Sequence, residues 1–382
     1  MSYLKNKTIL LISPQSWGDM YISKHHYAIE LSMMGNRVYF LNPPDENCLD
    51  EIEIRQINPN FPLLFGIEHR INFPYKLKFH AISVFHFLMK SHVKKILKKI
   101  NNHIDIVWSF DLGNLYPFKL FPKVNLKLFH PVDEPLNNTA LNAAKGSDII
   151  FSVTNEILKK YNALSIPSYF INHGLSNSFT IVDPIIKNVS SCIQVGISGN
   201  LTRKDIDRNI LLKIIRSNPD INFNFWGNYS LTNSNLMAAS DNETEEFLKA
   251  LKVESNVHLH GVVHPVKLSQ DFKNIDVFLI CYDNIKDQSK GTNYHKVLEM
   301  LSSGKVIISN NISTYEGKDN LIEMVTEKQS NIRLPELFQK VINNLIKYNS
   351  YELQKERIKF AQDNTYKKQI ERIEEILETH KF

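Results

Sequence analysis

The sequence predicts an α/β protein made of two doubly wound, Rossmann-like domains. Three observations support this prediction. The chain has 382 residues, too many for one ordinary α/β domain and enough for two of about 150–200 residues. Short apolar runs alternate with segments of helical spacing, which is typical of a mostly parallel sheet. The alternation stops in the polar stretch Asn177–Asn188 and then starts again.

In the first half, the apolar run Thr8–Ser13 predicts a strand close to the N-terminus. Tyr27–Met34 has helical spacing and ends at Gly35, a residue type common just after a helix. Asn36–Leu41 predicts the second strand. Later apolar runs predict four more strands: Asp105–Ser109, Lys127–His130, Asp148–Val153 and Tyr169–Asn172.

The second half repeats the pattern, and from Leu334 onward it is almost entirely helical. The predicted strands are Ile193–Ser198, Asn222–Trp226, Val257–Leu259, Val277–Ile280 and Val306–Ser309, and the helices between them are Ile206–Ser217, Leu268–Asn274 and Tyr294–Ser302. The expected divisions are a first domain at 1–176, a second domain at 189–360 and a terminal helix at 361–382 that packs on the first domain.

Composition narrows the class of protein. No run approaches the roughly 18–20 apolar residues that a membrane-spanning helix needs, and the N-terminal run lacks the features of a secretory signal. The three cysteines are widely spaced and fit neither a metal site nor a disulfide framework, which favours a reducing cytoplasm. The formal net charge of +5 is mild.

The positive charge is concentrated in the segment Tyr75–Ile100 and just before it. No acidic residue lies between His69 and Ile104, whereas these basic residues do: Arg70, Lys76, Lys78, Lys90, Lys94, Lys95, Lys98 and Lys99. Hydrophobic residues interleave with the lysines, as in amphipathic helices at membrane surfaces. A core-packed helix with a solvated lysine face fits equally well. Nucleic acid is not an expected partner, because no recognition motif accompanies the charge.

The stretch Gly291–Lys305 (GTNYHKVLEMLSSGK) carries the most specific pattern. Together with the strand Val277–Ile280, it resembles family-four glycosyltransferases, which have N-P-x-K-x-x-E followed by a-G-k-P-V here. The resemblance covers most of the second half and is weaker in the first. It implies the GT-B plan, in which two Rossmann-like domains face a cleft that holds the site, and C-terminal helices cross back to the first domain.

The resemblance implies that this stretch binds a nucleotide-diphosphate sugar. The implied donor-binding residues are Thr292, Asn293, Tyr294, Lys296 and Glu299. The backbone N–H groups at the helix start and the Lys296 ammonium suit a pyrophosphate, and Glu299 would accept from ribose hydroxyls. Taken without its flanks, the same segment fits a surface helix with an i,i+3 Lys–Glu pair.

Position 291 departs from the family pattern. Retaining members carry two glutamates eight positions apart, and Glu299 matches the second of them. The first position is Gly291, and the nearest acids are Asp283 and Asp287. The stereochemical outcome and the sugar contacts are therefore left open.

A second candidate donor site is the loop that follows the strand Ile193–Ser198, at the sheet end where ligands bind in doubly wound folds. Its implied donor-binding residues are Gly199, Asn200, Arg203 and Lys204. Arginine can fork onto phosphate oxygens and lysine is a flexible point charge, although both also fit solvated turn residues. Asp205 and Asp207 precede a helix, which favours helix N-terminal acids over a metal-binding pair, and no metal is expected.

Two further donor contacts are implied at strand ends. Trp226 ends one strand and Val263 follows another, where loops of the family border the nucleobase. A core tryptophan is the alternative for Trp226.

The first half is expected to bind the acceptor and to hold any proton-transfer group. Gly18 is the one match to the glycine-rich loop of the family, and Asp19 beside it is a candidate polar contact. His130 and Asp133 follow a strand and form the candidate catalytic pair, for sugar binding or as a general base in an inverting reaction. A structural histidine at a strand end fits His130 equally well.

The expected function is transfer of a hexose-type sugar from a nucleotide-diphosphate donor to a hydroxyl of a glycan or lipid-linked acceptor. The donor is a co-substrate, and no cofactor is expected. The expected place is the cytoplasm, with the inner face of the cell membrane as an option. A nucleotide-sugar 2-epimerase is one alternative, and a non-catalytic GT-B protein that binds nucleotide sugar is another.

Overall fold

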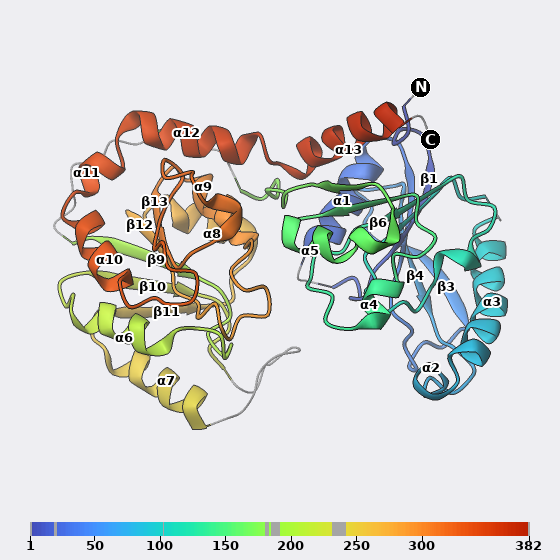
Figure 1. Cartoon of the computed structure of the whole chain (residues 1–382), viewed down its shortest axis with the longest axis horizontal. Helices are drawn as coiled ribbons and strands as arrows, with labels where there is room; N and C mark the ends of the chain where they lie inside the picture. The colour runs from blue at the N-terminus through green and yellow to red at the C-terminus, as the bar shows by residue number, and fades with distance from the viewer. Residues whose placement is uncertain are drawn as a thin grey trace. The chain divides into compact units, whose positions relative to one another are not determined.

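The computed structural model describes residues 2–18, 21–101, 103–179, 183–184, 192–230 and 242–380. The chain forms two compact units (Figure 1). Unit 1 comprises Met1–Asn172 and Tyr366–Phe382, and unit 2 comprises His173–Thr365. The divisions expected from sequence lie a few residues away, at 176 and at 360.

Unit 1 contains an eight-stranded sheet in the order β3-β4-β2-β1-β5-β6-β7-β8. Its strands are β1 (Thr8–Ile12), β2 (Arg37–Leu41), β3 (Ile52–Gln56), β4 (Leu64–His69), β5 (Ile106–Ser109), β6 (Leu126–Phe129), β7 (Ile149–Ser152) and β8 (Ser168–Phe170). Every pairing is parallel except that of β3 with β4. The chain winds outward from β1 in both directions, so the switch point lies between β1 and β5. The sequence patterns did not predict β3 and β4.

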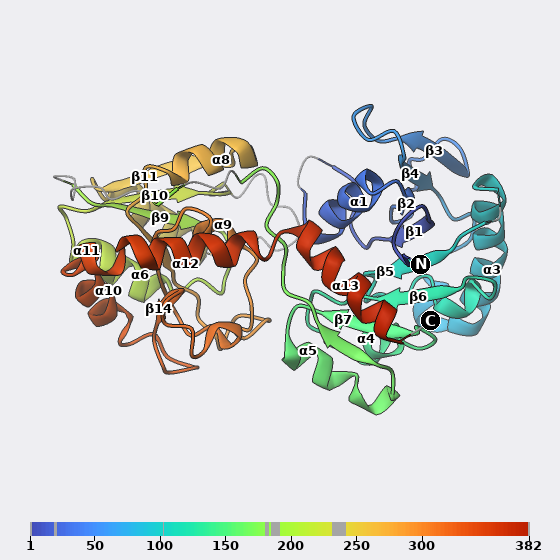
Figure 2. The same ribbon diagram turned by 90° about the horizontal axis from the view of Figure 1, so that it is seen from above.

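Helices cover both faces of this sheet. They are α1 (Ser23–Met33), α2 (Leu77–His80), α3 (Ile82–Lys99), α4 (Asn138–Asn142), α5 (Asn155–Lys160) and α13 (Tyr366–His380), with 3₁₀ turns at Phe118–Leu120 and Asn162–Leu164. The C-terminal helix α13 packs against α1 and shares one core with it, through Tyr366, Ile370 and Ile373 (Figure 2). The other face packs against α3 and α5.

Unit 2 contains a six-stranded, wholly parallel sheet in the order β11-β10-β9-β12-β13-β14. The strands are β9 (Gln194–Ser198), β10 (Asn222–Trp226), β11 (Val257–Gly261), β12 (Val277–Ile280), β13 (Val306–Ser309) and β14 (Ile322–Met324). Its switch point lies between β9 and β12. Two doubly wound units confirm the predicted fold class.

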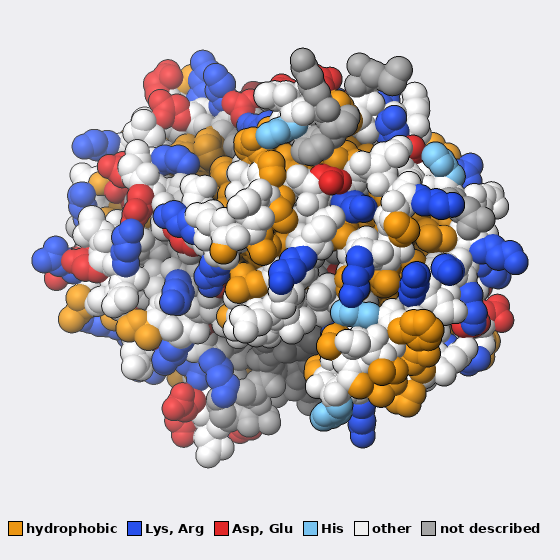
Figure 3. Space-filling model, turned by 45° about the vertical axis from the view of Figure 1, so that its right-hand side comes forward, with side chains coloured by type: hydrophobic (Ala, Val, Ile, Leu, Met, Phe, Trp, Pro, Cys, Tyr) orange, Lys and Arg blue, Asp and Glu red, His pale blue; other side chains and the backbone are white. Residues whose placement is uncertain are grey.

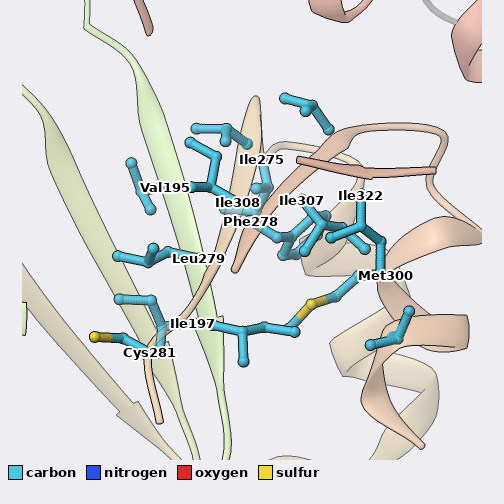
Figure 4. Packing of buried hydrophobic residues seen from close by; sticks show 14 of the residues in the cluster. Val195, Ile197, Ile275, Phe278, Leu279, Cys281, Met300, Ile307, Ile308 and Ile322 are labelled. Carbon is cyan, nitrogen blue, oxygen red and sulfur yellow. The ribbon is translucent and has the colours of Figure 1, made fainter. Parts of the chain in front are cut away.

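The helices of unit 2 lie on both sides of its apolar sheet. They are α6 (Arg208–Arg216), α7 (Asn242–Val253), α8 (Pro265–Phe272), α9 (Lys296–Leu301), α10 (Leu334–Ile342), α11 (Leu345–Tyr348) and α12 (Tyr351–Gln362), with a 3₁₀ turn at Ser313–Tyr315. All residues of β12 and β13 are buried, as expected for central parallel strands covered on both faces. Figure 4 shows part of this core, with Ile307 and Ile322 near Met300. Among the described residues, no helix combines the length and apolar character needed to span a bilayer.

Candidate functional site

Three loops of unit 2 meet at the carboxyl ends of β9, β10 and β11. The N–H of Gly199 donates to Trp226 O and the N–H of Gly227 donates to Gly261 O, both at 2.8 Å. Gly227 has φ +136°, and a Cβ there would lie 1.9 Å from Gly199 O. Only glycine allows two backbone segments to approach each other this closely. The three loops are therefore packed tightly against one another at this edge of the sheet.

Lys296 is the first residue of α9, and its side chain reaches the loop that follows β9. Its side chain is 8% exposed, and its Nζ donates to Ser198 O at 2.7 Å and to the Tyr282 hydroxyl at 2.5 Å. A Cβ on Gly199 would lie 2.5 Å from Lys296 Nζ. The two segments that the sequence singled out separately, around 199 and 296, are therefore in contact at the switch point of unit 2.

The Lys296 ammonium has no carboxylate partner in the part of the chain that the structure describes. Its two hydrogen-bond acceptors are neutral, and no Asp or Glu oxygen lies within 4.0 Å of it. Glu299, one turn further along α9, is half-buried and makes no ion pair with it. Burial raises the pKa of Glu299 to about 7, and the charge of Lys296 opposes that rise. The alternative of a surface helix with a Lys–Glu pair is therefore wrong.

Arg203 also lies close to the Tyr282 ring. Its guanidinium forms a two-point contact with Asp205, with Nε 2.8 Å from Oδ1, and lies 3.7 Å from Asp287. The hydrogen bond to Asp205 raises the pKa of Arg203. The Arg203 Cζ is 5.5 Å from the Tyr282 ring centroid and the Lys296 Nζ is 4.8 Å from it, so one ring borders two cations.

The remaining candidates of this loop face elsewhere. The Asn200 side-chain oxygen accepts from the N–H of Thr202 at 3.0 Å and from its hydroxyl at 2.8 Å, which closes the turn. Lys204 is exposed. Asp207 caps α6 by accepting from the N–H of Ile210 at 3.2 Å, as expected of an acid that precedes a helix. Within the described ranges, no group of three or more His, Cys, Asp or Glu side chains could hold a metal ion.

Asp287 organises the loop in which the family glutamate is missing. Its Oδ2 accepts from the N–H of Gly291 at 3.0 Å, the Tyr294 hydroxyl at 2.8 Å and the Ser289 hydroxyl at 2.6 Å. Gly291 has φ +66°, and a Cβ there would lie 2.6 Å from the Asn284 side chain. In this loop conformation, the positive φ and the Asn284 side chain leave no room for a glutamate side chain at 291.

Several groups of the helix start at Thr292–Tyr294 are engaged within the protein. The N–H of Thr292 donates to Ser289 O at 3.1 Å, so it is not open to a phosphate. Asn293 is buried, and the Tyr294 hydroxyl is engaged with Asp287. With six residues, α9 supplies little macrodipole, so the positive charge at this edge comes from the side chains of Lys296 and Arg203.

Trp226 is a core residue, which corrects its assignment as a donor contact. It is 4% exposed, its indole N–H donates to Asp271 at 3.2 Å, and His260 stacks on it at 4.9 Å between centroids. These contacts leave almost no surface for a nucleobase. Val263 is half-buried in the loop after β11 and packs against the same core.

His130 also lies in a core, which corrects the expectation that its side chain faces a substrate. It is 0% exposed and packs against Tyr27, Trp108 and Phe110, with ring centroids 5.3, 6.0 and 5.0 Å away. Neither ring nitrogen has a hydrogen-bond partner among the described residues. Burial lowers the pKa of His130 to about 3, so the imidazole is neutral. Asp133, by contrast, is exposed just after β6.

Gly18 is exposed, and a Cβ there would meet no atom within 4 Å. The described contacts therefore do not require glycine at position 18. A phosphate-binding glycine-rich loop, by contrast, would require it. Asp19 lies outside the described residues.

Unit 1 also contains a buried lysine that the sequence patterns did not indicate as a site residue. Lys24 lies in the first turn of α1, is 1% exposed and hydrogen-bonds to the Gln15 side chain. Burial lowers the pKa of Lys24 to about 8, while Asp133 and Asp111 raise it. These residues follow β1, β5 and β6, so Lys24 lies at the switch point of unit 1. The only signal in the sequence was its place, shortly after the first strand.

No protein-family model matches the chain, and no curated protein sequence matches it. Solved structures do. Sucrose-phosphate synthase from Thermosynechococcus elongatus is similar with a TM-score of 0.71, at 12% identity over 98% of both chains. Anabaena HepE in complex with UDP and glucose has a TM-score of 0.65, at 13% identity over 97% of this chain and 99% of that one. The lipopolysaccharide outer core galactosyltransferase WaaB has a TM-score of 0.60, at 16% identity over 95% and 98%.

These similarities extend over nearly the whole chain and agree with the two doubly wound units. The fold of the protein is the GT-B fold.

Proposed function

We propose that the protein is a glycosyltransferase that takes its sugar from a nucleotide-diphosphate donor. One observation carries the proposal: Lys296 is a buried residue, 8% exposed, at the switch point of unit 2, and no described carboxylate lies within 4.0 Å of its ammonium. A buried charge without a counter-charge is costly, and an anionic ligand offsets that cost. Ligands of doubly wound sheets bind at this point.

The neighbouring groups suit a diphosphate ester. Glu299 offers a carboxylate for hydroxyl groups of a ribose. The Arg203 guanidinium lies near the same tyrosine ring as Lys296, with its fork engaged by Asp205. The Lys296 ammonium would stabilise the charge that develops on a leaving diphosphate during sugar transfer. The similar HepE structure holds UDP and glucose, which supports a donor of this class.

A panel of nucleotide sugars tests the proposal. Incubation with UDP-, GDP-, ADP- and dTDP-sugars should release the nucleoside diphosphate slowly in the absence of acceptor, and the matching nucleotide should raise the thermal midpoint. Absence of release together with absence of any thermal shift would overturn it. An epimerised donor in the products would support the epimerase instead.

We further propose that unit 1 binds a membrane surface through residues 75–100, which would bring the enzyme to a lipid-linked or growing glycan acceptor. Phe79 and Phe87 are 71% and 75% exposed, and Ile82 is 45% exposed. Lys90 and Lys94 follow Phe87 on the same face of α3 and are also exposed. Figure 3 shows hydrophobic side chains gathered beside lysine and arginine side chains on this side of the molecule.

Binding to vesicles with and without anionic lipid tests the membrane proposal. The variant K90E/K94E with Phe87→Ser should lose binding to anionic vesicles. Lys95 is left unchanged because it pairs with Glu51 at 2.6 Å. The control K355E/K359E places the same charge change on exposed positions of α12. Equal binding by wild type and the α3 variant would contradict the proposal.

A further inference from the structure

Tyr282 follows β12 and lies close to both cations of the site. Its hydroxyl accepts from Lys296 Nζ at 2.5 Å, and its ring centroid lies 4.8 Å from that nitrogen and 5.5 Å from Arg203 Cζ. A Cβ on Gly199 would lie 2.8 Å from the Tyr282 hydroxyl. The phenol and the ammonium therefore touch the same point of the loop after β9.

The backbone holds Tyr282 firmly in this place. Its N–H donates to the side chain of Asn310 at 3.0 Å, and its carbonyl accepts from the side chain of Asn331 at 2.8 Å. Asn310 is fully buried, and Tyr282 itself is 8% exposed. The ring thus has a fixed position from which it can orient a flexible neighbour.

The two cations are held by groups of different charge. Arg203 contacts two carboxylates, Asp205 and Asp287, which compensate its charge. Lys296 is held by a carbonyl oxygen and a phenol oxygen, which are neutral. A neutral acceptor orients an ammonium group and leaves its full charge available to a ligand, whereas a carboxylate would cancel that charge.

We propose that Tyr282 is a positioning residue for the diphosphate of the donor. Its hydroxyl holds the Lys296 ammonium against Gly199 without neutralising it. This inference rests on the proposed function, because it assigns Tyr282 a role in the same site. The role is indirect: Tyr282 acts through Lys296.

A double-mutant cycle on the full chain tests this role. The affinities for UDP and for inorganic pyrophosphate are measured by calorimetry for wild type, Y282F, K296M and Y282F/K296M. Y282F removes one hydrogen bond to a charged group and should weaken binding about tenfold. In the K296M background the same change should alter affinity less than about twofold, because the group that Tyr282 positions is absent.

Controls separate the role from folding. Y348F removes a hydroxyl from a half-buried tyrosine of α11 and should leave affinity unchanged. Thermal midpoints of all variants show whether unit 2 remains folded. Y282E places a carboxylate beside Lys296 and should weaken binding more than Y282F does, since it cancels the charge as well.

The outcomes are distinct. Unchanged affinity in Y282F, or an equal loss in both backgrounds, overturns the positioning role and leaves the proposed function standing. A wild type that binds neither pyrophosphate nor any of UDP, GDP, ADP and dTDP overturns the proposed function, and the inference falls with it.

Discussion

Each unit buries one lysine at the switch point of its sheet, and the two differ in the charges around them. Lys24 in unit 1 is 1% exposed and Lys296 in unit 2 is 8% exposed. Asp111 and Asp133 act on Lys24 and raise its pKa against the effect of burial. Lys296 is held by neutral oxygens, and Arg203 borders the same tyrosine ring.

This difference indicates that a lysine at the switch point of a sheet does not by itself make an anion-binding site. Both lysines lie at the switch point of a doubly wound sheet, which is where ligands bind in this kind of fold. In unit 1, Asp111 and Asp133 partly offset the effect of burial on the pKa of Lys24, although neither lies within 4.0 Å of its ammonium. In unit 2, the neutral partners of Lys296 leave its charge available to a diphosphate. The comparison supports the proposal that the anionic part of the donor binds unit 2.

Matched substitutions of the two lysines should give the largest effect. Lys296→Met should weaken UDP binding about 100-fold, because it removes a buried charge that contacts the anion. Lys24→Met should change UDP affinity less than about threefold, because the proposed diphosphate site lies in unit 2 and Lys24 lies in unit 1. Calorimetry with both variants checks this. Similar losses of UDP affinity in the two variants would contradict the proposed difference between the lysines. Such losses would indicate phosphate contacts in unit 1 as well.

Substitution of Gly291 measures how rigidly the loop of unit 2 is built. Gly291→Ala should lower the free energy of unfolding by about 3 kcal/mol, because it adds a collision with Asn284 to the strain of a positive φ. Denaturant unfolding measures this quantity.

Gly317→Ala is the matched control for that strain. Gly317 has φ +74° with no atom within 4 Å of a Cβ, so its substitution should cost only about 1–2 kcal/mol. If Gly291→Ala costs no more than Gly317→Ala, the loop can move, and the steric argument against a glutamate at 291 fails.

The sequence supported the architecture because central strands such as β12 and β13 are continuous apolar runs. It missed β3 and β4, since β3 is only partly buried and lacks a clear apolar run. It singled out the segments of Gly199 and Lys296 separately, and it placed the first of them at the carboxyl end of a parallel strand. That much of the site follows from topology and local pattern.

The direction of side chains could not be predicted in this way. His130 and Trp226 lie at strand ends, yet both turn into cores, and a strand-end position does not say which way a ring points. Tyr282 and Asp287 gain their roles from contacts with Lys296 and Gly291 that depend on loop conformation. Long-range side-chain geometry, rather than pattern, decides these cases.

His130 offers a test on the unit 1 side of the comparison. His130→Phe should raise the free energy of unfolding by about 1–3 kcal/mol at pH 7, because it removes buried nitrogens that lack partners. The effect should grow in acid. The pKa is about 3 in the folded state and 6.5 as an ordinary histidine, so the unfolded state takes up the proton first and wild type loses stability below pH 6.5.

Denaturant unfolding from pH 7 to pH 5 measures both parts of this prediction for wild type and variant. The loss in wild type should be about 1.4 kcal/mol per pH unit below 6.5 from this group alone. Reduced nucleotide turnover in a stable His130→Phe variant would contradict the core assignment and restore a substrate contact.

The smallest expected effect concerns Glu299 and the pH dependence of UDP affinity. It tests one contact of the unit 2 site. Its pKa of about 7 means that only a minority of molecules carry the carboxylate at pH 6 and most carry it at pH 8. If the carboxylate accepts from ribose hydroxyls, UDP affinity should gain about tenfold over this range from this group. Because the phosphates of UDP also titrate, Glu299→Gln supplies the reference slope, and only the difference counts. Parallel slopes for wild type and Glu299→Gln would remove Glu299 from the site, leaving the positive edge formed by Lys296 as the sole anchor there.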